Sequence, residues 1–190
     1  MDWAALPTVV RISAAHALRR LDAFDDQTTL DTRTGCFTKK LFVGLHPNHD
    51  PSFYQRTLRE QGGYETFVRT NPRRRLDVEC RNCGQASRTC TRCGEPLVHY
   101  PEKGVDVAVS TDMLLHAAGH VDGHPTQVAI LCSGDTDFVP AVTAAQRLGL
   151  VVVVASWNRQ ANELFQVADA VVRLDDLIDR LTFHAGSRRQ

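Results

Sequence analysis

The chain has 190 residues, 43% of them hydrophobic and 23% charged, which are ordinary values for a globular protein that buries a core. Its 22 basic and 22 acidic side chains cancel, so nucleic-acid binding has to come from a local patch rather than from the net charge. Because no apolar run approaches the roughly 20 residues that span a bilayer and no secretory signal opens the chain, we expect a cytoplasmic protein that does not enter a membrane.

Helical and strand patterns alternate along the chain. In chain order we predict a helical stretch over 3–23, a loop over 25–35, a strand over 40–45, a helix over 52–61 and a strand over 64–69. Beyond the segment 70–100 we predict strands over 128–132, 150–155 and 170–173, and helices over 112–118, 139–148, 162–167 and 174–181. The run over 150–155 is almost purely Val, which is typical of a parallel strand covered on both faces. This order predicts an α/β fold with a mostly parallel sheet between helices.

The segment 70–100 interrupts this alternation. It is rich in Arg and Cys and poor in large apolar residues, so we interpret it as an inserted module. We therefore divide the chain into a first part of the α/β domain (1–76), an insertion (77–98), a second part of the domain (99–185) and a frayed tail (186–190).

Four cysteines of the insertion, Cys80, Cys83, Cys90 and Cys93, form two CxxC pairs, and a Gly follows each pair. Glycine lets the backbone fold back, so that both sulfurs of a pair can face one ion. Four thiolates give the tetrahedral ligand set that Zn²⁺ prefers. The segment is too short and polar to fold on its own, so zinc should supply its folding energy. A redox motif is less favoured, because a thioredoxin-type CxxC occurs once and opens a helix.

A basic run surrounds the cysteines. Only Asp77 and Glu79 oppose its seven arginines, which are Arg69, Arg73, Arg74, Arg75, Arg81, Arg88 and Arg92. Guanidinium groups suit phosphate contacts, so we predict that Arg73, Arg74 and Arg75 bind an RNA backbone. The alternative is a solvated loop that zinc stabilises.

The most informative stretch is the turn that follows the predicted strand over 128–132. It places Asp135 and Asp137 two residues apart at the carboxyl end of a buried strand, where open α/β sheets bind ligands. Two such carboxylates repel each other unless a cation or a proton lies between them. Hard oxygen ligands suit Mg²⁺ or Mn²⁺, which indicates metal-assisted hydrolysis of a phosphodiester. The alternative is an Asx-turn in which an Asp caps the next helix.

Three motifs in this order resemble the NYN family of PIN-like nucleases: Lys103-Gly-Val-Asp-Val, Thr111-Asp-Met, and Ser133-Gly-Asp-Thr-Asp-Phe-Val-Pro140. The resemblance runs from about Lys40 to Leu177 and is interrupted by the insertion. It implies a Rossmann-like PIN fold and a ribonuclease that depends on Mg²⁺ or Mn²⁺.

The resemblance also implies roles for single residues. Asp106 and Asp135 correspond to metal ligands, Asp137 to a third acid and Asp112 to the rim of the site, while Ser133 bonds a carboxylate or a phosphate. Two alternatives remain open: a surface ion pair between Asp106 and Lys103, and a helix N-cap at Asp112. His46 and His49, in a loop after the strand over 40–45, are either substrate contacts or ordinary loop residues.

One departure from the family pattern stands out. The family opens with a strand that ends in an Asp of the metal site, and no such strand precedes Asp2. Its loss would expose both neighbouring strand edges. Three explanations remain open: a shortened chain, a second copy or partner chain that supplies the strand, or a degenerate member that binds RNA without cutting it. A zinc-mediated protein-interaction module is a further alternative function.

Overall fold

The computed structural model describes residues 5–19, 37–61, 63–120, 127–157 and 162–181. The predicted loop over 25–35 and the tail over 186–190 lie outside these ranges. The helices are α1 (Leu6–Arg19), α2 (Pro51–Phe53), α3 (Val105–Ala117), α4 (Val139–Arg147), α5 (Asn162–Val167) and α6 (Ile178–Leu181). The π-helix η1 (Tyr54–Gln61) continues α2, and the 3₁₀ helices are η2 (Thr136–Phe138) and η3 (Leu174–Leu177). No feature of the sequence predicts the wide hydrogen-bond spacing of η1.

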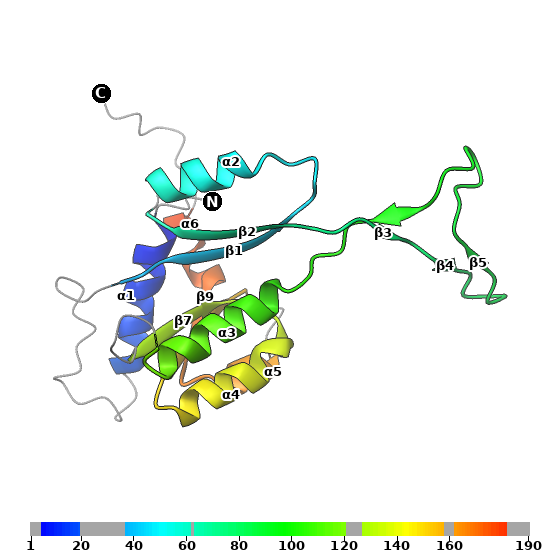
Figure 1. Ribbon diagram of the computed structural model, residues 1–190. Coiled ribbons are helices and arrows are strands. Elements are labelled where there is room, and N and C mark those ends of the chain that lie inside the picture. The colour runs from blue at the N-terminus through cyan, green and yellow to red at the C-terminus, as the bar shows by residue number, and fades with distance from the viewer. Residues whose placement is uncertain (1–4, 20–36, 62, 121–126, 158–161, 182–190) are drawn as a thin grey trace.

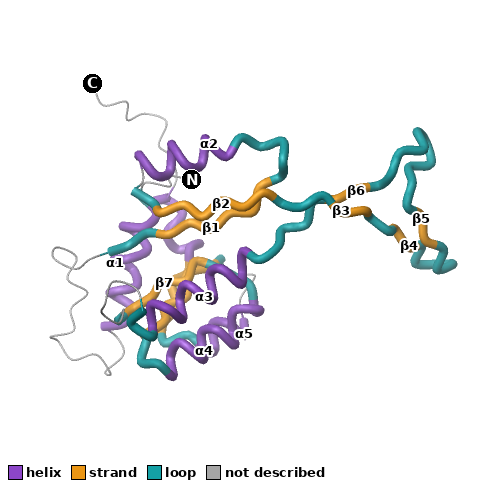
Figure 2. Tube along the Cα trace, viewed as in Figure 1, coloured by secondary structure: helices purple, strands orange, loops and turns teal. Residues whose placement is uncertain are grey.

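The strands divide between a body and an arm. The strands of the body are β1 (Lys40–Leu45), β2 (Glu65–Thr70), β7 (Val128–Cys132), β8 (Val151–Ser156) and β9 (Ala170–Arg173). The strands of the arm are β3 (Arg74–Arg75), β4 (Val78–Glu79), β5 (Ala86–Ser87) and β6 (Val98–His99). In Figures 1 and 2 the arm extends away from the body, and the predicted insertion over 77–98 lies within it.

The core of the body is a three-layer sandwich around β8. Side chains alternate across a strand, so Val152 and Val154 pack toward α3, α4 and α5, while Val153 packs toward α1 and α6. All three valines are fully buried. The Val-rich run is therefore the central, doubly covered strand that the sequence predicts.

The body strands form two separate parallel sheets. One has the order β7-β8-β9, and the other is the pair β1-β2. The α/β class and the parallel pairing are as predicted, but among the described residues no hydrogen-bonded pairing joins β1 to β7. A missing central strand would produce this division. That explanation stays a prediction, because the pairing does not identify a segment that would bond to these edges.

The root of the arm packs tightly on the body at Gly44 in β1. A Cβ atom at Gly44 would lie 2.5 Å from Cγ of Glu102, so a larger residue here would require the Glu102 and Asn71 side chains to move. On the outgoing side of the arm, the Asn71 N–H donates to the Leu45 carbonyl at 2.7 Å. Both contacts hold the root of the arm against the carboxyl end of β1.

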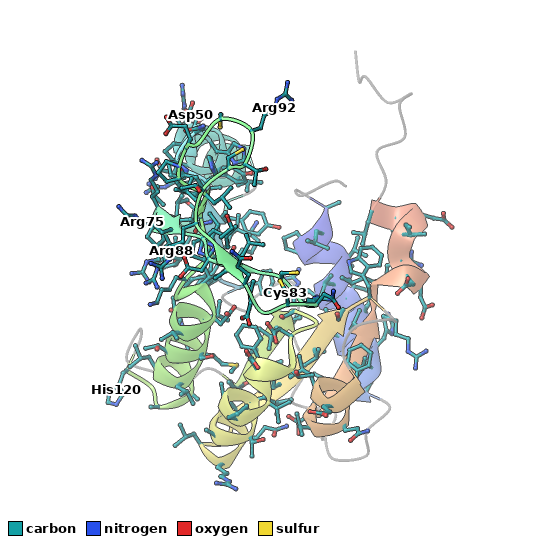
Figure 3. The ribbon with its side chains drawn as sticks, turned by 90° about the vertical axis from the view of Figure 1, so that its right-hand side faces the viewer. Asp50, Arg75, Cys83, Arg88, Arg92 and His120 are labelled. Carbon is teal, nitrogen blue, oxygen red and sulfur yellow. The ribbon has the colours of Figure 1, made fainter. Side chains whose placement is uncertain are left out.

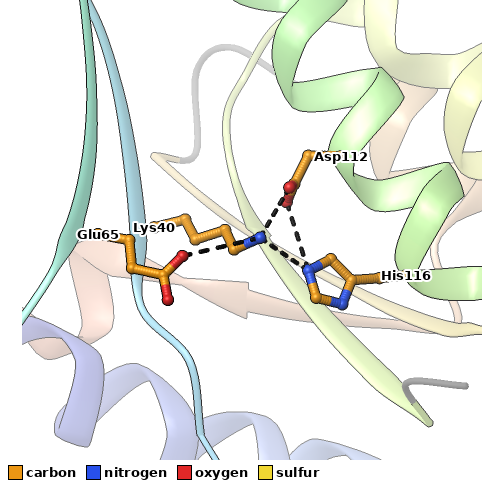
Figure 4. A network of polar contacts seen from close by, with 4 residues as sticks. All are labelled: Lys40, Glu65, Asp112 and His116. Atoms are coloured by element: carbon orange, nitrogen blue, oxygen red, sulfur yellow. Dashed lines mark hydrogen bonds and ion pairs between the residues drawn. The ribbon is translucent and has the colours of Figure 1, made fainter. Parts of the chain in front are cut away.

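A polar network ties β1 to α3 (Figure 4). Nζ of Lys40 donates to Oδ1 of Asp112 at 2.7 Å and lies 2.8 Å from Nε2 of His116. Glu65 lies at the edge of the network, 3.9 Å from the same Nζ. Only 16% of the Lys40 side chain and 24% of the Asp112 side chain are exposed, so this ion pair is partly desolvated. It links the small sheet to the helix that covers the large one.

We expect the substitution Asp112→Ala to destabilise the fold by about 1–3 kcal/mol, because it leaves a partly buried ammonium group without its carboxylate. Chemical denaturation measures the loss. Asp106→Ala is the matched control, since Asp106 is an exposed Asp on the same helix. Equal losses in the two variants would contradict a stabilising role for the ion pair.

Candidate functional site

The turn after β7 is built around Asp135. Its side chain caps η2, with Oδ1 accepting from the Asp137 N–H at 2.9 Å. The Asp135 N–H donates to Oγ of Ser133 at 3.2 Å, so a second bond fixes the same turn. The predicted cap at this turn is therefore confirmed. Both carboxylates remain exposed at the carboxyl edge of the sheet, where a cap and a ligand role are compatible.

Asp106 reaches the same edge from α3. Gly104 is the N-cap, with a φ of +78° that favours glycine, and its carbonyl accepts a long bond from Nη1 of Arg69 at 3.5 Å. Asp106 then lies exposed in the first helical turn, where the helix dipole favours a negative charge. Because α3 runs from the arm root back to the start of β7 (Figure 1), its first turn lies at the carboxyl edge. No ion pair with Lys103 occurs in the described part of the chain.

The acidic residues share an edge without forming one metal centre. Within the described residues, no three His, Cys, Asp or Glu side chains come close enough together to hold an ion. The ligand type of Asp106, Asp135 and Asp137 suits Mg²⁺ or Mn²⁺, but their arrangement does not amount to a complete site.

Asp112 lies apart from the other three acids. It occupies the middle of α3, whose N-cap is Gly104, so the capping alternative for Asp112 is wrong. Its carboxylate is bonded to Lys40, the first residue of β1, at the amino end of that strand. Asp112 therefore has a structural contact that the sequence pattern did not reveal.

The two CxxC pairs form matching turns at the end of the arm. The Gly84 N–H donates to the Cys80 carbonyl at 2.8 Å, and the Gly94 N–H donates to the Cys90 carbonyl at 2.9 Å. Both glycines have positive φ, near +70°. Backbone N–H groups of the following residues in each turn lower the pKa of Cys80 and of Cys90. Each turn is therefore suited to hold thiolate.

The two turns lie apart. Figure 3 shows Cys83 of the first turn and Arg92 of the second on opposite sides of the arm. Since the described residues contain no group of three metal-binding side chains, the four cysteines occur as two separate pairs. The thiol donors fit zinc in their chemistry, while the zinc site formed by all four cysteines stays a prediction.

The arm arginines differ in their partners and faces. Arg88 is paired with Asp77 through bonds of 2.8 and 3.3 Å. In the described part of the chain, Arg73, Arg74 and Arg75 are exposed and make no ion pair. Because side chains alternate along β3, Arg74 and Arg75 lie on opposite faces, and Arg73 borders the same hollow as Arg75.

A small aromatic cluster lies at the carboxyl end of β1. The His46 ring meets the Tyr100 ring edge-on, with centroids 4.1 Å apart, and lies 5.8 Å from the His49 ring. No sequence pattern points to Tyr100, which only the return of the arm brings beside His46. The cluster supplies flat surfaces next to the acidic edge.

Comparison with protein families then assigns the chain. The NYN domain model matches residues 81–175, half of the chain. The chain belongs to the NYN family. The matched range contains all four predicted acids of the NYN motifs and leaves out β1 and β2. NYN domains are α/β domains of PIN-like fold that generally act as ribonucleases with divalent metal ions.

Comparisons with curated proteins and with solved structures gave no match, and no membrane span was found in the described ranges. None of the helices in the described ranges is both long and apolar enough to cross a membrane.

We expect Cys132 to react slowly with a thiol reagent. It is an exposed residue, yet the protein atoms packed around its thiol raise the pKa to about 11. A raised pKa leaves less thiolate at about pH 8, so alkylation should be about tenfold slower than for an ordinary cysteine after allowing for the higher nucleophilicity. Peptide mass spectrometry after a pulse of iodoacetamide measures the rate. The unfolded chain is the reference, and equal rates in both states would refute the desolvation.

Proposed function

We propose that this NYN chain is a metal-dependent ribonuclease that hydrolyses RNA at the carboxyl edge of its sheet. The observation that carries the proposal is the position of the motif acids. Asp106 and Asp135 come from different elements, α3 and the turn after β7, yet both are exposed at one edge. This is where open α/β sheets bind their ligands.

In this proposal Asp106 and Asp135 are the ligands of Mg²⁺ or Mn²⁺, and Asp137 is a third acid. Such an ion lowers the pKa of bound water and stabilises charge on a phosphate. The protein's own part is to orient the ligands. Two backbone N–H bonds, to Asp135 Oδ1 and to Ser133 Oγ, hold the turn that carries Asp135. Asp112 is left out, because its carboxylate is bonded to Lys40.

We further propose that Cys80, Cys83, Cys90 and Cys93 hold one structural zinc ion that joins the two turns of the arm. The lowered thiol pKa values of Cys80 and Cys90 support this, since zinc binds thiolate. Arg73 and Arg75 would then contact RNA from a more rigid arm. Arg74, on the other face, is not included.

A second candidate is an RNA-binding or regulatory module that has lost catalysis. The separation of the acids supports it, because no three of the described candidates come close enough to share an ion. No described strand pairs with the outer edges of β1 and β7, which also allows a strand from a second copy or a partner chain to complete the sheet. A zinc-mediated protein-interaction module would use the exposed arm instead.

The decisive experiment is cleavage of end-labelled RNA with Mg²⁺ and then with Mn²⁺. We expect the double variant Asp135→Asn/Asp137→Asn to lose at least about a hundredfold in rate, because the neutral amides no longer supply charged metal ligands. Asp175→Asn/Asp176→Asn is a control with the same charge change in η3. RNA binding without cleavage by the wild type would reject the ribonuclease and favour the binding module.

Zinc content is a separate test. We expect about one zinc per chain by elemental analysis, and its loss in the variants Cys80→Ser and Cys90→Ser. Cys132→Ser is the matched control, because this cysteine lies on β7 outside the arm. A wild-type chain that binds no zinc at micromolar concentrations would contradict the site, and so would a Cys90→Ser variant that keeps it.

A further inference from the structure

The paired two-residue strands β3 and β6 of the arm present chemically different faces. β3 and β6 are antiparallel, with Arg75 opposite Val98 and Arg74 opposite His99. Directly opposed residues share a face and successive residues alternate. One face therefore carries Arg75 together with Val98, and the other carries Arg74 with His99.

The first of these faces is hollowed. Arg73, Arg75, Pro96 and Val98 line a cavity of about 300 Å³. This volume is at the lower end of the range for small-ligand sites, which is roughly 300–1,000 Å³. Its lining combines two guanidinium groups with two apolar side chains, so it offers cations and an apolar surface in one place.

No salt bridge of the described residues engages the two arginines of this cavity. Asp77, a nearby acid of the arm, is occupied by a two-bond pair with Arg88. Arg73 and Arg75 make no ion pair within the described ranges, and both are exposed. The two cations are therefore available to an anion that comes from outside the chain.

We propose that this cavity holds one nucleotide of single-stranded RNA. The Arg73 and Arg75 guanidinium groups bind its phosphate, for which their planar, multidentate geometry is suited. Pro96 and Val98 contact the flat face of its base or ribose. The proposal rests on the proposed function, because it specifies the form of RNA that the arm receives.

The lining favours a single strand over a duplex. In a double helix the base faces are stacked inside, and only phosphates and groove edges are accessible. An unpaired single strand can turn a base outward. A duplex would use the positive charge of the arm without using Pro96 or Val98. The arm leaves the body after β2 and returns before α3. The residues that would bind RNA therefore precede, in the chain, the helix that carries Asp106.

The test compares adjacent arginines on opposite faces. Arg75→Gln and Arg74→Gln remove the same charge from the same strand, so a general basic patch responds equally to both. We expect Arg75→Gln to weaken binding of a fluorescent single-stranded RNA about tenfold and Arg74→Gln less than about threefold. Binding of the matching duplex should change by similar small factors in both variants. All titrations use the full chain with its zinc content measured, at several salt concentrations.

A second variant tests the apolar side of the cavity without changing charge. Val98→Thr keeps the branched shape and the strand preference but replaces one methyl group by a hydroxyl. We expect it to weaken single-strand binding about threefold, while the slope of affinity against salt stays as in the wild type. Circular dichroism checks that the arm and the body still fold.

Each outcome decides a separate claim. Equal effects of Arg74→Gln and Arg75→Gln, or equal affinity changes for single strand and duplex, overturn the cavity as the binding site. The same holds if Val98→Thr has no effect. Titrations of Asp135→Asn/Asp137→Asn and cleavage assays of the wild type separate the two proposals. If the cavity binds RNA but the wild type does not cleave it, only the ribonuclease is rejected. If RNA cleavage is unchanged by Arg75→Gln, only the cavity is rejected.

Discussion

The packing of α3 on two sheets is the constraint on which the rest of the structure depends. Met113 and Ala117 bury one side of this helix in the core of the large sheet. Asp112, the residue before Met113, bonds Lys40 of the small sheet. Without hydrogen bonds between β1 and β7, the helix serves as a connection between the sheets. Its first turn carries Asp106, so the same helix places a motif acid at the carboxyl edge.

The arm and the acidic edge are physically coupled through the start of this helix. Glu102 packs against Gly44 so closely that a side chain at Gly44 would collide with it. Arg69 at the end of β2 contacts the Gly104 carbonyl, two residues before Asp106. An arm that holds RNA would therefore be attached to the body close to the proposed site. Because the insertion lies between β2 and α3, both of its ends contact the body near Asp106.

Local sequence patterns predicted the helices and strands well, but they did not predict contacts between residues far apart in the chain. The strands at Lys40–Leu45 and Val128–Cys132 begin and end where the apolar runs and turn residues indicate. The cap at Asp135 was also visible, because its partner is two residues away. The Lys40–Asp112 pair was not, since a charged residue at a strand end and one on a helix give no sign that they meet. The division into two sheets was equally hidden, because strand pairing depends on which edges meet and not on any one strand.

The proposed metal centre depends on how the two sheets are held relative to each other. Carboxylates from α3 and from the turn after β7 can share an ion only if those elements are held at a fixed spacing. Among the strands that the structure describes, none pairs with the free edges of β1 and β7, so each can accept a further strand. A strand that paired with both would join the two sheets and fix β7 relative to the small sheet on which α3 rests. The position of Asp106 relative to Asp135 would then be set by backbone hydrogen bonds, which are far stiffer than a side-chain ion pair such as Lys40–Asp112.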